Sequence, residues 1–268
     1  MEHMLWLTAI ILGLIQGLTE FIPISSSGHL VIAQTFLSGA SDHLFLEFIN
    51  LGTFLALLVY FRKKIWGIIT DIFVNRKYTL ARNIIITSVP AGIVGYLLSD
   101  FINATPQFFG SAVVVAVTLF VVGVVMIVLE KLPHASAVEN GDKLSGWRAL
   151  AIGLAQMVAL IPGVSRSGST IIAGRLSGLK PAQAAEYSFL ASLPIMLGVT
   201  LKTFVGDRAY LMDNLTTLAI SNLFAFAAGL FAVGFLMRYL SNHSLAIFGW
   251  YRIGLALVLT IILLIQYS

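Results

Sequence analysis

The apolar and polar positions divide the chain into long uncharged stretches separated by short polar segments. A helix needs roughly 17–25 mostly apolar residues to cross about 30 Å of hydrocarbon, and six stretches reach or approach that length. They cover residues 45–61, 83–98, 111–130, 185–205, 216–238 and 246–266. This pattern predicts an all-α polytopic membrane protein with six transmembrane helices.

Two further apolar regions are each interrupted by a polar break. Residues 5–37 are broken at 23–28, and residues 147–176 are broken at 162–168. Non-helical backbone at membrane depth is tolerated only where protein or a water-filled cavity surrounds it. We therefore predict two re-entrant helix pairs, each of which returns to its own side of the membrane. The alternative is that each region forms two tilted spans joined by a Ser/Gly-rich surface loop.

The two breaks have related sequences, P-x-S-S-S-G-H at 23–29 and P-G-V-S-R-S-G at 162–168, and the likeness extends beyond them. Residues that recur at a fixed offset of 140 are Gly13/Gly153, Leu14/Leu154, Gln16/Gln156, Ser25/Ser165, Ser27/Ser167, Gly28/Gly168, Ile32/Ile172 and Ala33/Ala173. This repetition predicts two halves, about 5–130 and 147–266, that each contribute a break to one shared site.

Composition supports one integral membrane domain over residues 1–268. The chain is 58% hydrophobic and only 10% charged, with a mean hydropathy of +0.94, whereas a soluble domain has about 25% charged residues. The absence of cysteine excludes disulfides, thiolate catalysis and Cys-ligated zinc. The net charge of +4 is too small to indicate a nucleic-acid partner.

The basic residues predict the orientation in the membrane. Loops 62–82 and 131–148 are rich in Lys and Arg, whereas loops 38–44 and 99–110 contain neither. By the positive-inside rule the first two loops are cytoplasmic, which places both termini on the external side. Three spans then separate the two breaks, so the second half is inverted relative to the first, as in many transporters.

Each break predicts a helix N-terminus that is able to bind an anion. Serine is a favoured N-cap, and the unpaired N–H groups and positive dipole end of a helix attract phosphate. Arg166 lies within the second break, where a charged residue is costly and suggests function. The alternative is an arginine that reaches the membrane interface, which is also the position expected for Arg175, Arg238 and Arg252.

Glu20 is a second costly residue, and it follows Gln16 by one helical turn. A carboxylate beside a phosphate would repel it unless a cation lies between them, which predicts a hard divalent ion, Mg²⁺ or Ca²⁺, near Glu20 and Gln16. The alternative is an ion pair between Glu20 and Arg166 that holds the two halves together, and the two arrangements are compatible.

The first break also contains a candidate nucleophile and base. Ser26 is central among three serines, and His29 follows it at a helix-turn spacing that would allow proton exchange. We therefore expect Ser26 to act as nucleophile, and Ser25 and Ser27 to act as caps or phosphate ligands.

Segments 16–29 (Q-G-L-T-E-F-I-P-I-S-S-S-G-H) and 162–168 resemble the two signatures of the bacterial undecaprenyl-diphosphatases, the bacitracin-resistance family, and the likeness extends over essentially the whole chain. The resemblance implies removal of the terminal phosphate from undecaprenyl diphosphate, which regenerates the lipid carrier for peptidoglycan synthesis. It also implies dependence on a divalent metal, location in the bacterial inner membrane, an active site that opens to the periplasm, and in many cases a homodimer.

The same resemblance implies roles for individual residues. The catalytic residues would be Glu20, Ser26, His29 and Arg166, and the phosphate-contacting residues would be Ser25, Ser27, Gly28, Ser165, Ser167 and Gly168. The chain departs from the family at Gln16, where glutamate is usual, and this puts a metal site with two carboxylates in doubt.

The rival hypothesis is a polyprenyl-phosphate flippase or another transporter, because inverted repeats with a polar centre suit transport equally well. A purely structural membrane protein would leave Glu20 and Arg166 unexplained. We therefore predict a membrane hydrolase.

Overall fold

The computed structural model describes residues 2–36, 43–105, 108, 111–132 and 138–267. The first half of the chain contains α1 (Glu2–Phe21), α2 (Ser26–Phe36), α3 (His43–Tyr60), α4 (Arg62–Phe73), α5 (Thr79–Leu97), α6 (Ser99–Ala104) and α8 (Ala112–Lys131). The second half contains the 3-10 helix η1 (Gly141–Lys143), α9 (Gly146–Val158), α10 (Arg166–Leu176), α11 (Pro181–Gly206), α12 (Arg208–Asp213), α13 (Leu215–Leu240) and α14 (Ala246–Tyr267). The predicted loops 38–44, 99–110 and 131–148, and residue 37, fall partly or wholly outside the described residues.

The prediction of an all-α polytopic membrane protein is confirmed. Helices α5, α8, α11, α13 and α14 are long and apolar enough to cross a membrane, and α3 with α4 forms a sixth candidate that bends by 69°. The described bounds agree with the six predicted stretches to within a few residues at most ends. A long uncharged run is sufficient to define a span because lipid leaves no partner for backbone groups except the helix itself.

The two interrupted regions each form two helices with a break between them. Helix α1 ends at Phe21 before α2 begins at Ser26, and α9 ends at Val158 before α10 begins at Arg166. Helices α2 and α10 have 11 residues each, which corresponds to roughly 16 Å at 1.5 Å per residue and is too short to span the hydrocarbon.

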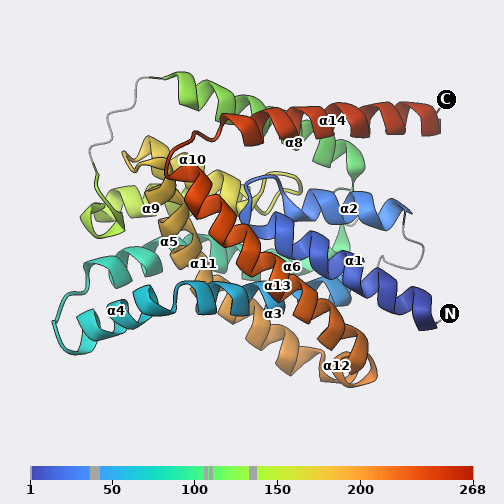
Figure 1. The fold of residues 1–268 in the computed structure, drawn as a ribbon, viewed down its shortest axis with the longest axis horizontal. Helices are drawn as coiled ribbons and strands as arrows, with labels where there is room; N and C mark the ends of the chain where they lie inside the picture. The colour runs from blue at the N-terminus through green and yellow to red at the C-terminus, as the bar shows by residue number, and fades with distance from the viewer. Residues whose placement is uncertain (1, 37–42, 106–107, 109–110, 133–137, 268) are drawn as a thin grey trace.

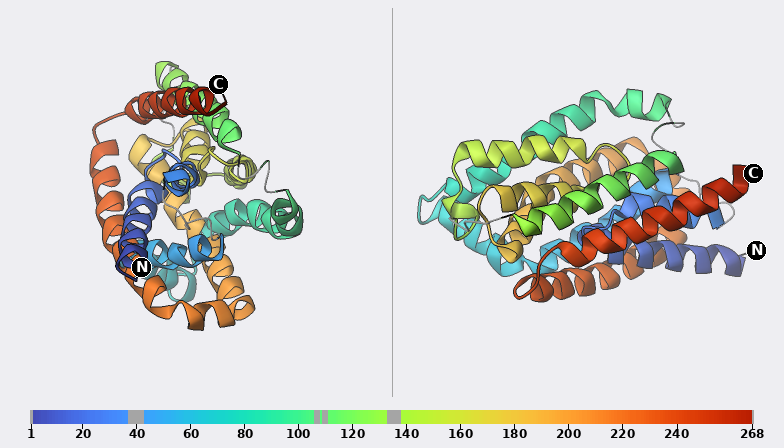
Figure 2. Two further views of the ribbon diagram at one scale, coloured as in Figure 1. Left: turned by 90° about the vertical axis from the view of Figure 1, so that its right-hand side faces the viewer. Right: turned by 90° about the horizontal axis from the view of Figure 1, so that it is seen from above.

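The two broken regions enter the molecule from opposite ends (Figures 1 and 2). Helix α1 runs inward from the end at which the chain starts, and α2 returns toward that end. Helix α9 runs inward from the end occupied by α4, and α10 returns to it. Both breaks therefore lie in the interior between the long helices.

Close helix contacts at glycines surround these breaks. A Cβ added to Gly13 of α1 would lie 2.3 Å from the Ser221 carbonyl oxygen of α13, and one added to Gly153 of α9 would lie 2.7 Å from the Thr87 carbonyl oxygen of α5. Only glycine permits backbones to approach so closely. The small residues therefore fix how near the broken helices come to the long ones.

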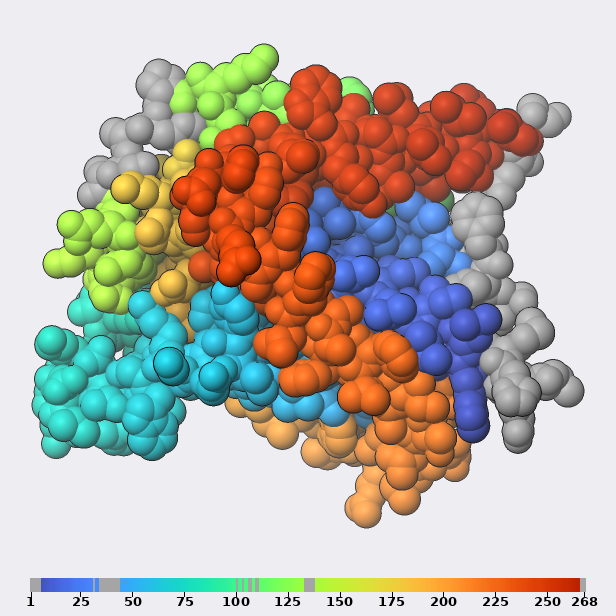
Figure 3. Space-filling model, viewed as in Figure 1, coloured from blue at the N-terminus to red at the C-terminus, as the bar shows by residue number. Residues whose placement is uncertain are grey.

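Helices α8 and α14 cross at a second pair of glycines and lie side by side in Figure 1. A Cβ on Gly123 would lie 2.8 Å from the Gly249 carbonyl oxygen. Helix α13 packs along α1, and Figure 3 shows α13 and α14 together on one outer face. Leu223 and Phe231 of α13 are more than 60% exposed, as expected for side chains that contact lipid tails.

Candidate active site

The first break is organised around Ser25. Its backbone has a φ of 75°, and its hydroxyl accepts a hydrogen bond from the Gly28 N–H at 3.2 Å while lying 3.1 Å from the Ser27 hydroxyl. A positive φ at a residue other than glycine is strained and is found disproportionately at functional sites. Ser25 thus caps α2, and the break holds a conformation that is locally unfavourable.

The second break repeats this geometry. Ser165 also has a φ of 75°, its hydroxyl accepts from the Gly168 N–H at 3.1 Å, and the Ser167 hydroxyl lies 3.1 Å away. The two breaks therefore present two matching helix N-termini of the kind that bind anions.

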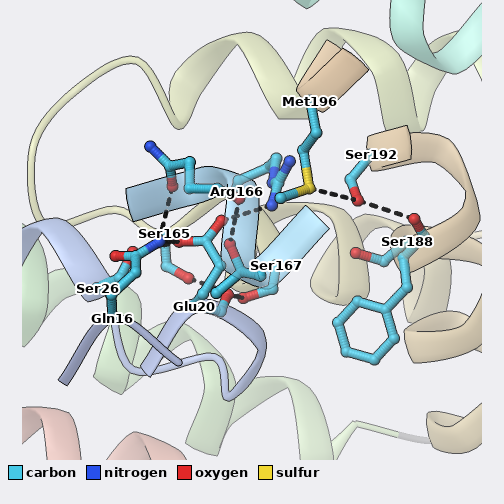
Figure 4. Close-up of polar contacts among 12 residues, drawn as sticks. Gln16, Glu20, Ser26, Ser165, Arg166, Ser167, Ser188, Ser192 and Met196 are labelled. Atoms are coloured by element: carbon cyan, nitrogen blue, oxygen red, sulfur yellow. Dashed lines mark hydrogen bonds and ion pairs between the residues drawn. The ribbon is translucent and has the colours of Figure 1, made fainter. Parts of the chain in front are cut away.

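Glu20 joins the two breaks (Figure 4). Its Oε2 atom accepts a hydrogen bond from the Ser26 hydroxyl at 2.6 Å, and its Oε1 atom accepts one from Nη2 of Arg166 at 2.6 Å. The Glu20 and Arg166 side chains are 13% and 21% exposed, and Ser26 is half-buried. Residues from α1, α2 and α10 thus meet at one carboxylate, and the ion pair considered from the sequence is present.

Gln16 extends this cluster toward α3. Its Nε2 atom donates to Glu20 Oε2 at 3.2 Å and to Asn50 Oδ1 at 2.7 Å, and the side chain is buried. The assignment of the amide nitrogen and oxygen follows from these two acceptors. The Gln16 amide therefore holds the Glu20 carboxylate without adding charge, and Asn50 in turn holds Gln16.

His29 lies in the same region but does not contact Ser26 through any hydrogen bond described. Its Nδ1 atom lies 2.8 Å from the Ser25 carbonyl oxygen, its Nε2 atom lies 2.7 Å from the Tyr251 hydroxyl, and its ring stacks on Tyr251. A carbonyl only accepts, so Nδ1 carries the proton, and the neutral ring accepts from Tyr251 through Nε2. The predicted exchange of a proton between His29 and Ser26 stays a prediction.

The site offers a divalent cation only part of a ligand set. Among the described residues, no three His, Cys, Asp or Glu side chains lie close enough together to hold a metal. Glu20 supplies one carboxylate, and Gln16, Asn50 and Ser26 supply neutral oxygens. Mg²⁺ commonly binds through one or two carboxylates together with substrate phosphates. The residues present therefore fit a divalent cation only if it takes its remaining ligands from outside the protein.

Sequence reasoning missed three polar residues that support this cluster, namely Asn50, Tyr251 and Arg252. The interface position expected for Arg252 is wrong, because the residue is fully buried and bonds to backbone carbonyls of both breaks. The signal was available in the sequence, since Arg252 interrupts an apolar stretch as Arg166 does. Arg175 is also buried, and it pairs with Glu130 at 3.5 Å.

These features define a class: a helical membrane protein with two capped polar breaks that converge on a carboxylate and a guanidinium. Comparison with known proteins then identifies the family. A family model described as bacitracin resistance protein BacA matches residues 9–258, so the chain belongs to the BacA family.

Curated relatives agree with this assignment over nearly their full lengths. The chain is 37% identical over 271 residues to an undecaprenyl-diphosphatase of Nitrosomonas europaea, which covers 100% of this chain and 97% of the relative. It is 39% identical to undecaprenyl-diphosphatase 1 of Paraburkholderia xenovorans, in an alignment that covers 100% of this chain and 98% of the relative. It is 35% identical to an undecaprenyl-diphosphatase of Bordetella pertussis, in an alignment that covers 94% of this chain and 94% of the relative.

Proposed function

We propose that this protein hydrolyses undecaprenyl diphosphate to undecaprenyl phosphate and inorganic phosphate. The relatives that match its full length carry the name of this activity. The observation that carries the proposal is the convergence of Ser26 and Arg166, from different breaks, on the two oxygens of Glu20. The chain therefore holds a hydroxyl nucleophile, a proton acceptor and a fixed positive charge within one cluster.

The site suits a diphosphate headgroup attached to an apolar tail. The N-termini of α2 and α10 offer N–H groups and positive dipole ends to phosphate oxygens, and Ser25, Ser27, Gly28, Ser165, Ser167 and Gly168 line these two turns. Arg166 bonds to Glu20 through one nitrogen, which leaves other donors of its fork for phosphate oxygens. The polyprenyl tail would lie among the apolar helices.

The reaction follows from the hydrogen bonds of Ser26. Its oxygen attacks the terminal phosphorus, and the bond from that phosphorus to the bridging oxygen breaks, so that undecaprenyl phosphate leaves with the electron pair. Glu20, which already accepts the Ser26 proton at 2.6 Å, takes it as the bond forms. Water then attacks the phosphorus of the phosphoserine, and the bond from that phosphorus to the Ser26 oxygen breaks. Glu20 returns its proton to the Ser26 oxygen, and inorganic phosphate leaves with the protons of the water.

Arg166 and the two helix ends stabilise the charge that develops on the phosphate oxygens during this transfer. A divalent ion, when bound at Glu20 and the diphosphate, would neutralise further phosphate charge as a Lewis acid. The prediction from the sequence that His29 is the base is an alternative to Glu20, and it requires the His29 ring to release Tyr251.

We also infer an inverted-repeat architecture with two re-entrant helix pairs. Three observations support it. The broken regions enter from opposite ends (Figure 2), their caps have matching φ angles and hydrogen bonds, and the equivalent glycines Gly13 and Gly153 make equivalent close contacts. In this proposal both termini and the opening of the site face the periplasm. A homodimer stays a prediction drawn from the family resemblance.

The experiment is release of phosphate from undecaprenyl diphosphate by the purified protein in detergent. We expect Ser26→Ala to lower kcat by at least about a hundredfold, because it removes the nucleophile. Ser241→Ala is the matched control, because among the described residues that hydroxyl bonds to the Met237 carbonyl at the end of α13, and its loss should leave the rate unchanged.

A quenched single-turnover reaction then separates the two chemical routes. Phosphate bound covalently to Ser26 supports the serine route, whereas its absence supports direct attack by water. A wild-type protein that releases no phosphate would refute the hydrolase and favour the flippase or transporter alternative.

A further inference from the structure

We infer that Arg252 is a positioning residue that clamps the two polar breaks together and thereby sets the placement of Ser26 relative to Arg166. The inference rests on the proposed function only in that the placement of Ser26 and Arg166 is expected to affect phosphate release. The clamp itself is a matter of geometry and can be tested separately.

Arg252 is buried in a way that demands an explanation. The side chain is 0% exposed and lies in α14, a helix that is otherwise apolar in this stretch. None of the ion pairs between described residues includes Arg252, and its Nε atom has no hydrogen-bond partner. A buried charge without a carboxylate is costly, so its presence points to a role that an apolar residue could not fill.

The guanidinium group binds both breaks at once. Its Nη1 atom donates to the Pro23 carbonyl oxygen at 3.1 Å, and its Nη2 atom donates to the Gly163 and Val164 carbonyl oxygens at 2.5 and 3.1 Å. Positions 23 and 163 differ by 140, the offset of the sequence repeat. One fork therefore bridges two equivalent carbonyls, one in each half of the protein.

These carbonyls need donors because they lie in the breaks that follow α1 and α9. Carbonyl groups beyond the end of a helix have no intrahelical partner. Arg252 donates to three of them, at Pro23, Gly163 and Val164.

Helix α14 holds Arg252 at the required depth. The crossing with α8 at Gly123 and Gly249 is so close that a Cβ on Gly123 would also lie 3.2 Å from the Arg252 Cβ. The hydroxyl of the neighbouring Tyr251 is hydrogen-bonded to Nε2 of His29 in the first break. Consecutive residues of α14 thus fix the breaks and the orientation of the histidine.

Arginine and lysine differ in what they can do at this position. A lysine keeps the charge but has a single ammonium group, whereas the arginine fork presents separate nitrogens to separate carbonyls. If Arg252 acts by bridging, Arg252→Lys should behave like the neutral Arg252→Met. If it acts only by charge, Arg252→Lys should behave like wild type.

The test measures kcat and KM for phosphate release together with amide hydrogen exchange. We expect both variants to lower kcat by at least about tenfold, with KM within about threefold of wild type, because misplaced groups lose transition-state contacts. Exchange should rise in peptides that cover residues 21–30 and 160–170, and it should stay unchanged in α13. Arg238→Lys, an exposed arginine of α13, is the control.

Two outcomes would overturn the clamp. Retention of wild-type kcat by Arg252→Lys would show that charge alone matters, and a uniform rise of exchange across all helices would show a merely structural role. A wild-type protein without phosphatase activity would refute the proposed function, while raised exchange confined to the two breaks would still support the clamp.

Discussion

The Glu20 carboxylate accepts hydrogen bonds from residues of three helices, α1, α2 and α10. These three bonds fix the position of the carboxylate in the site. Arg166 balances its charge, Ser26 donates to the oxygen that can take its proton, and Gln16 adds a neutral amide. One carboxylate is thus matched by one guanidinium. A bound cation would compete with Arg166 for Glu20 unless substrate phosphates engaged the arginine instead.

The chemical groups occupy positions at which the two repeats differ. Glu20, Ser26 and His29 correspond to Leu160, Arg166 and Ser169 at the offset of 140, whereas the capping serines and glycines are the same in both copies. The shared residues build two similar helix ends, and the divergent residues make one composite site. This division is readable in the sequence and is consistent with the hydrogen bonds that the two breaks make.

Gln16 should limit the affinity for a divalent metal. We expect Gln16→Glu to lower the Mg²⁺ concentration that gives half-maximal phosphate release by about tenfold, because a second carboxylate strengthens a hard-cation site. Glu20→Gln should abolish the metal response and lower kcat by about a hundredfold or more. If the Mg²⁺ titration curves of wild type, Gln16→Glu and Glu20→Gln superimpose, no cation binds at Gln16 and Glu20.

At the scale of elements, close backbone contacts at glycines position the broken helices against the long helices. Gly13 brings α1 against α13, and Gly153 brings α9 against α5. Gln16 and Glu20 follow Gly13 on the same helix, so the approach of α1 to α13 determines where the carboxylate lies. Each break depends on a serine cap with a positive φ. This strained conformation costs of order 1–3 kcal/mol per serine, and packing against the surrounding helices must offset that cost.

Added bulk at Gly13 should therefore destabilise the protein. Gly13→Ala places a methyl group 2.3 Å from the Ser221 carbonyl oxygen, and we expect a loss of about 1–3 kcal/mol with a lower melting temperature in detergent. Gly92→Ala in α5 is the matched control, because no atom of the described residues lies within 4 Å of its added Cβ. Equal melting temperatures for the two variants would mean that α1 and α13 can separate without cost.

At the scale of the whole molecule, the charged loops and the broken helices define two ends. Helix α4, with Arg62, Lys63 and Lys64, lies at one end, and α12 lies with the two terminal helix ends at the other (Figure 1). The positive-inside rule assigns the α4 end to the cytoplasm. The two breaks would then approach one site from opposite leaflets.

The absence of cysteine makes this orientation directly testable. Asn75→Cys, after α4, and Asp213→Cys, at the end of α12, are both exposed positions outside the proposed site. In intact cells an impermeant maleimide should label Asp213→Cys, and it should label Asn75→Cys only after permeabilisation. The reverse labelling would invert the proposed topology, and labelling of both in intact cells would invalidate the test as a measure of sidedness.

The amino-acid sequence alone determined the membrane class, the approximate spans, the two breaks and the residues Glu20, Ser26 and Arg166 as candidates. Lipid imposes a fixed apolar length on each span, and a polar break within such a run is conspicuous, so these features are local. Only the tertiary structure decided that Glu20 joins Ser26 to Arg166, that His29 bonds to Tyr251, and that Arg252 is buried between the breaks. Lipid-facing and buried positions are equally apolar in a membrane protein, and therefore hydropathy cannot tell which face of α14 carries its arginine inward.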